Sequence, residues 1–220
     1  MWRKRWVKIV LLFVVVLIGG FGWVIYSVKQ VRPFYTAALA IPKEKLHEGN
    51  REFLNRASRF QNDVRKPGEW NLVITDEQIN GWLAVDLANN HPDALPAEVQ
   101  QPRVDIDPTQ ISIGATIDRE PFPVAASLDI KLQLSSNHEL ALRVITARLG
   151  NLPWPVESII AQLRRATTKQ GWTVRETTID NDPVLLLKPP APNDGQAEVT
   201  LESLELREGE IYLRGKTTRK

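Results

Sequence analysis

The chain has 220 residues, of which 43% are hydrophobic and 25% charged, and this composition is typical of a folded protein. Cys is absent, which excludes disulfides, thiolate metal sites and cysteine nucleophiles. Six of the 28 basic residues and none of the 26 acidic ones precede Pro33, so the chain from Pro33 onward has a net charge of −4. Because the nucleic-acid backbone requires clustered Lys and Arg, we expect no nucleic-acid partner.

Residues 9–28 form an uncharged, apolar run of twenty residues, long enough to cross about 30 Å of hydrocarbon. Trp2 and Trp6 precede this run, and Trp23 and Tyr26 lie near its other end, as in the aromatic belts of membrane helices. Four basic residues precede the run and only two closely follow it. The positive-inside rule therefore predicts a cytoplasmic N-terminus and an extracytoplasmic C-terminal domain.

A cleaved signal peptide is the alternative interpretation of this segment. Such a peptide has an apolar region of about 7–15 residues that ends at a small-x-small site. Here the run is longer, and the nearest such site, at residues 38–40, lies too far downstream. We predict an uncleaved anchor, with a basic tail at 1–8, a transmembrane helix at 9–28, a juxtamembrane segment and helix at 29–68, and an extracytoplasmic domain at 69–220.

Apolar residues at helical spacing predict three amphipathic helices after the anchor. The first, at 43–66, is either a stalk or a helix that docks on the domain. The second, at 76–88, begins at Thr75 as N-cap, with Gln78 in the capping-box position. The third, at 156–170, should place Ile160 and Leu163 against the strand at 122–134.

Alternating apolar and polar residues predict antiparallel strands between and after these helices. The longest runs from Phe122 to Leu134, with seven apolar residues on a dry face and residues such as Ser127 and Asp129 on a wet face. The alternation changes parity after Val144, and again within the strand that ends near residue 206, which predicts a bulge or a bend at each position. Further strands are expected at 70–75, 104–106, 111–117, 140–149, 174–179, 184–187 and 199–213. The predicted fold is α+β, a curved antiparallel sheet packed on two or three amphipathic helices.

Three segments resemble the YpmS-like family of membrane-anchored bacterial proteins. They are the Thr-acid-acid-Gln-Ile-Asn-x-Trp-Leu segment at 75–83, the Gly-x-Leu-Pro-x-Pro turn at 150–155, and the Leu-x-Leu-x-x-Gly-x-Ile-x-Leu hairpin at 204–213. The resemblance implies an anchored domain whose fold is similar to that of tubular lipid-binding proteins. It implies no particular chemistry.

Motifs of known catalytic chemistry are not found in the sequence. It contains no Gly-rich phosphate loop, no His-Glu-x-x-His and no Gly-x-Ser-x-Gly. The acidic pairs at 105–107 and 180–182 suggest turns, since neither continues into a calcium loop. Acids that meet only in space, as in glycosidases, are the remaining enzymatic alternative. We predict a protein that is not an enzyme and has no metal or cofactor.

A helix at 156–169 spans only about 20 Å, whereas the apolar face at 122–134 is about 40 Å long. Another helix, a ligand or a partner must cover the rest. We therefore predict a groove near the strand end that holds Phe122 or Leu134, bordered by Trp82 or Trp154, with Asn80 as its polar residue. The alternative roles are backbone binding for Asn80 and core packing for both Trp residues.

Two functions follow from these expectations. The first is a single-pass membrane protein whose extracytoplasmic domain binds a lipid or other apolar ligand between sheet and helices. The second is a structural or protein-interaction module of the cell envelope with a filled core. The sequence identifies no envelope protein as partner.

Overall fold

The computed structural model describes residues 30–91, 94–120, 122–179, 182–190 and 197–219. The described helices are α2 (Pro33–Leu39), α3 (Lys43–Val64), α4 (Asp76–Trp82), the π-helical turn η1 (Leu83–Leu87), α5 (Ala88–Asn90) and α6 (Val156–Lys169). The described strands are β1 (Gly68–Thr75), β2 (Val99–Ile106), β3 (Ile111–Ile117), β4 (Val124–Leu134), β5 (Leu140–Leu149), β6 (Leu152–Pro153), β7 (Thr173–Ile179), β8 (Asp182–Lys188), β9 (Ala197–Arg207) and β10 (Glu210–Arg219). The predicted α+β class with an antiparallel sheet is confirmed.

The predicted transmembrane helix at 9–28 lies outside the described residues. Within the described ranges, no helix is both long and apolar enough to cross a membrane.

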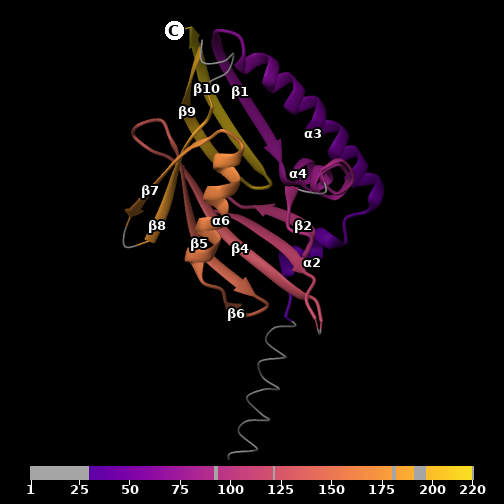
Figure 1. Ribbon diagram of the computed structural model, residues 1–220. Coiled ribbons are helices and arrows are strands. Elements are labelled where there is room, and N and C mark those ends of the chain that lie inside the picture. Colours follow the sequence, from indigo (N-terminus) through magenta and orange to yellow (C-terminus); the bar gives the residue numbers. More distant parts are fainter. Residues whose placement is uncertain (1–29, 92–93, 121, 180–181, 191–196, 220) are drawn as a thin grey trace, which may run out of the picture.

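The strands form two antiparallel sheets, whereas the sequence predicted one curved sheet. The larger has the order β2-β3-β4-β5-β8-β7, with β6 paired to β5, and the smaller has the order β1-β10-β9. Figure 1 shows the smaller sheet beside α3 and beyond one end of the larger sheet. The prediction of one sheet was wrong because alternation identifies a hairpin but not the strand that it pairs with. Here β10 pairs with β1, and Gly215 lies opposite Trp70.

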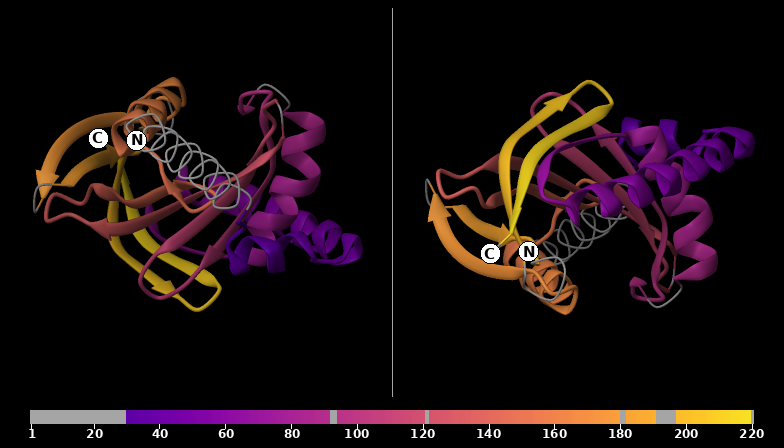
Figure 2. Two further views of the ribbon diagram at one scale, coloured as in Figure 1. Left: turned by 90° about the horizontal axis from the view of Figure 1, so that it is seen from below. Right: turned by 90° about the horizontal axis from the view of Figure 1, so that it is seen from above.

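The apolar face of β4 is covered by α6 and by the smaller sheet together. Ile130 of β4, Ile160 of α6 and Leu185 of β8 belong to one apolar cluster, against which Leu206 and Ile211 of the smaller sheet pack. The predicted burial of Ile160 is confirmed, but α6 lies mainly against β5, β7 and β8. The rest of the strand was expected to be covered by another helix, a ligand or a partner. The smaller sheet covers much of it, and Ile79 of α4 packs against the same cluster. Figure 2 shows these layers from both ends.

The helix predicted at 43–66 docks on the body as α3, where it crosses α4. Glycines make this crossing close, since a Cβ on Gly81 would lie 2.3 Å from the backbone nitrogen of Asn50. A Cβ on Gly49 would lie 2.5 Å from the carbonyl oxygen of Glu77. The capping box at Thr75 and Gln78 is confirmed, and it starts α4 immediately after β1.

Both predicted irregularities are confirmed, and each is a bulge. Ile145 is the extra residue of β5 opposite Asp129 and Ile130 of β4. In the smaller sheet, β9 has its extra residue at Glu202, where the register against β10 shifts. A third irregularity, which the sequence did not predict, shifts the pairing of β2 with β3 between Gln100 and Arg103.

Candidate functional site

The structure does not bring the five predicted groove residues together. Asn80 and Trp82 lie on α4, and Trp154 lies between β6 and α6. Leu134 ends β4 and belongs to the apolar region around Trp70 of the smaller sheet. Phe122 precedes the start of β4, so the strand is shorter than predicted by two residues. We call the end of the body at Phe122 the anchor end and the end at Leu134 the far end.

Asn80 is a structural residue, as the alternative interpretation held. Its side-chain amide donates to the carbonyl of Val104 at 2.8 Å, and its oxygen accepts from the Val104 N–H, also at 2.8 Å. The side chain is 2% exposed. These two bonds provide partners for the backbone N–H and carbonyl of Val104 at the outer edge of β2, and they fix α4 beside that strand.

Trp82 packs between α3 and the segment that follows α5. Its ring lies 5.5 Å from that of Phe53 and 6.2 Å from that of His91. The indole N–H donates to Asp86 at 3.1 Å. Trp82 therefore packs against His91, and His91 lines a groove that the sequence did not predict.

This groove lies between η1 and the first half of β2, and we call it the η1–β2 groove. It has a volume of about 320 Å³, at the lower limit for small-molecule sites. Leu83, Leu87, Leu95 and Val99 supply apolar side chains, while His91 and Gln100 supply polar ones. Leu87 is buried and the other apolar residues are half-buried. The groove therefore combines an apolar surface with a few polar groups, which is the usual composition of a ligand site.

Backbone irregularities concentrate around the η1–β2 groove. One wall is the π-helical turn at Leu83–Leu87. This conformation is rare in proteins overall, but where it occurs it is frequently at a functional site. The other wall contains the bulge after Gln100, and Gln101 adopts a positive φ of 50°. Such a conformation costs about 1–3 kcal/mol in a residue other than Gly. The prolines at 96 and 102 are only a weak sequence signal for this groove, because helix periodicity does not distinguish a π-turn from an α-turn.

Trp154 lines a second, much smaller hollow. It lies over β3, β4 and β5 beside α6, with a volume of about 80 Å³. Ala126, Leu128 and Ile159 are among the other lining residues. Because this is well below the size of a ligand site, the hollow accommodates at most part of a molecule.

The face of β4 that was predicted to be wet is partly buried, and this correction concerns Asp129 above all. Asp129 is 4% exposed and Ser127 is 8% exposed. The Asp129 carboxylate accepts hydrogen bonds from Thr146 at 2.6 Å, Ser112 at 2.7 Å and Arg32 Nη1 at 2.6 Å. The prediction was wrong because Arg32 lies 97 residues away in sequence, and its contact leaves no local pattern.

These contacts affect the ionisation of Asp129. Burial opposes the charged form, but hydrogen bonds from Thr146, Ser112 and Arg32 outweigh it and hold the pKa of Asp129 below its ordinary value. The carboxylate therefore stays charged and paired at neutral pH. With Arg32 it forms an ion pair that fixes the start of α2 to β4.

The start of α2 is fixed to the same face by a second contact. Tyr35 is 2% exposed, and its hydroxyl donates to the carbonyl of Gln101 at 3.0 Å. The ring occupies the space over Gly114, where a Cβ would lie 2.5 Å from it. Burial raises the pKa of the Tyr35 hydroxyl. The chain that enters the body at Arg32 is therefore attached within four residues, and it contacts the strained residue of the η1–β2 groove.

In the described part of the chain, no group of three or more His, Asp or Glu side chains is arranged to hold a metal ion. Asp107 accepts bonds from the backbone of Thr109 and Gln110, as expected of a turn residue. The acidic pair at 180–182 extends outside the described residues.

Comparisons with protein-family models, with curated proteins and with solved structures find no match for this chain. The resemblance to the YpmS-like family therefore stays a prediction.

Proposed function

We propose that this chain is a single-pass membrane protein of the cell envelope whose extracytoplasmic body binds a small apolar molecule, such as part of a lipid, in the η1–β2 groove. The observation that carries the proposal is the groove itself. It pairs a volume of about 320 Å³ with a mainly apolar lining and with backbone irregularity on both walls.

The position of the groove supports a ligand that comes from the membrane. Val99 of the groove lies opposite Ile117 of β3, and Ile117 lies opposite Val124, the first residue of β4. The groove therefore lies at the anchor end of the larger sheet. The described chain begins at this same end, where α2 starts (Figure 1), and the apolar run at 9–28 precedes it in the sequence.

Titration of the full chain in detergent micelles with a fluorescent fatty acid tests this proposal. Ala88 lines the groove and is exposed, so Ala88→Trp should fill the groove without disturbing the core. Asn89→Trp places the same ring on the next exposed residue and serves as the matched control. We expect saturable binding by the wild type and by Asn89→Trp, and its loss in Ala88→Trp. Equal binding by all three would contradict the proposal.

The second candidate is a structural or protein-interaction module. It is favoured by the cover over β4, because the smaller sheet and α6 pack on its apolar cluster and the hollow beside Trp154 measures about 80 Å³. A chain that is folded and correctly oriented but takes up no fatty acid would favour this second function.

Membrane orientation has its own test. The chain has no Cys, so Asp63→Cys introduces a single thiol at an exposed site on α3. A membrane-impermeant maleimide should label this thiol in intact cells and should label Lys4→Cys only after permeabilisation. The reverse pattern would contradict an extracytoplasmic body.

A further inference from the structure

The attachment of α2 limits how far the body can lie from the membrane. Arg32 is fixed to Asp129, and it lies four residue steps after Val28, the last residue of the apolar run. An extended chain spans at most about 3.6 Å per residue, so this connection spans at most about 14 Å. The headgroup layer alone is roughly 5–8 Å thick on each side of the hydrocarbon. No stalk therefore separates the body from the bilayer.

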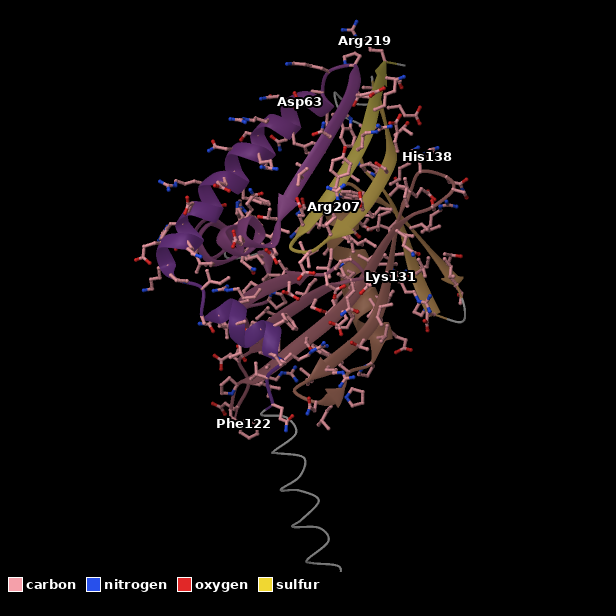
Figure 3. All side chains as sticks on the ribbon, turned by 180° about the vertical axis from the view of Figure 1, so that it is seen from behind. Asp63, Phe122, Lys131, His138, Arg207 and Arg219 are labelled. Atoms are coloured by element: carbon pink, nitrogen blue, oxygen red, sulfur yellow. The ribbon has the colours of Figure 1, made fainter. Side chains whose placement is uncertain are left out.

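The anchor end of the body has residues suited to this position. Val31 is 45% exposed, and Phe122 and Trp154 are half-buried. Figure 3 places Phe122 at the opposite end of the body from Asp63 and Arg219. Asn151, in the turn before Trp154, donates a hydrogen bond to the side chain of Gln30, so this turn lies beside the entering chain. Aromatic side chains are enriched at the headgroup level of membranes.

From these observations we infer that the anchor end, formed by Val31, Phe122 and Trp154 with the turns that hold them, rests on the phospholipid headgroups. This inference depends on the proposed anchor but not on ligand binding in the η1–β2 groove. The exposed turn before Phe122 reads Asp118-Arg119-Glu120, so its charges nearly cancel. The contact is therefore apolar and aromatic, and it does not require anionic lipid.

The test uses the full chain in phosphatidylcholine vesicles that contain a phospholipid with a headgroup spin label. Glu120→Cys and Asp63→Cys each give one thiol on an exposed residue, the first at the anchor end and the second at the far end. An NBD fluorophore on each thiol reports its proximity to the spin label through quenching. We expect several-fold stronger quenching at position 120 than at position 63, with no increase when anionic lipid is added.

Three results would overturn the inference, and they are distinguishable. Equal quenching at the two positions, in a chain that floats with the vesicles, would show that the anchor holds but the body does not rest on the bilayer. A chain that fails to float with the vesicles would contradict the proposed anchor itself. Quenching at position 120 that appears only with anionic lipid would contradict an apolar contact.

Discussion

The two ends of the larger sheet differ in how their apolar residues are covered. At the far end, Leu134 packs against the cluster of Trp70, Val199 and Leu201, which joins the two sheets. At the anchor end, Val124 and Ala126 continue the same alternation and are half-buried, as Leu134 is, but Ala126 lines the hollow beside Trp154. One continuous sequence pattern thus meets a buried cluster at one end and a small hollow at the other. The groove and the proposed membrane contact both lie at the end with the hollow.

The largest expected difference between the two ends is in stability. Trp70 is 4% exposed, and Trp70→Ala should lower the free energy of unfolding by about 3–5 kcal/mol. Trp154→Ala, at the anchor end, should cost less, about 1–2 kcal/mol, because its ring is only partly buried and borders a hollow. Urea unfolding in micelles, followed by circular dichroism, measures both changes. Equal losses would show that the anchor end is as closed as the far end.

Asn80→Ala should lower the free energy of unfolding by roughly 2–6 kcal/mol, since two buried backbone groups of Val104 lose their partners at about 1–3 kcal/mol each. The same unfolding measurement checks this value. Fatty-acid binding measured under native conditions should remain, because Asn80 is not part of the groove. Loss of binding with no loss of stability would assign Asn80 to the ligand instead.

Asp129→Asn should cost about 1–3 kcal/mol, because it removes a buried charge from three hydrogen bonds while nearly keeping the side-chain volume. Arg32→Gln should cost less, since its side chain is 32% exposed and solvent screens the pair. A double-mutant cycle isolates the coupling between the two residues. Additive losses would show that Arg32 does not hold α2 through Asp129.

The stability that the Arg32–Asp129 ion pair contributes should also depend on pH, which is a smaller effect. The folded pKa of Asp129 lies below the ordinary value of about 3.9, so its contribution is complete above that pH and is lost as the pH falls through the folded value. The stability difference between wild type and Asp129→Asn should therefore shrink below about pH 4. Unfolding curves at pH 7 and pH 3 measure it, and a constant difference would contradict the assignment.

Local signals in the sequence predicted the elements well, because their causes lie within a few residues. The capping box at Thr75 and the bulge at Ile145 are examples, since each depends on near neighbours in the chain. The backbone-binding alternative for Asn80 was also correct.

Long-range pairing was not predictable from the same signals. The smaller sheet depends on β10 returning to β1, and the burial of Asp129 depends on Arg32. The η1–β2 groove was missed because the widening of η1 and the positive φ of Gln101 are properties of the packed chain. Neither the pattern of apolar residues nor the charge distribution records them.

Native mass spectrometry of the full chain, extracted gently from its membrane, tests ligand binding in the groove most directly. The wild type should retain an apolar molecule at one copy per chain, and Ala88→Trp should lose it while Asn89→Trp keeps it. Bare protein in all three preparations would contradict the proposed ligand and would support the structural or protein-interaction module.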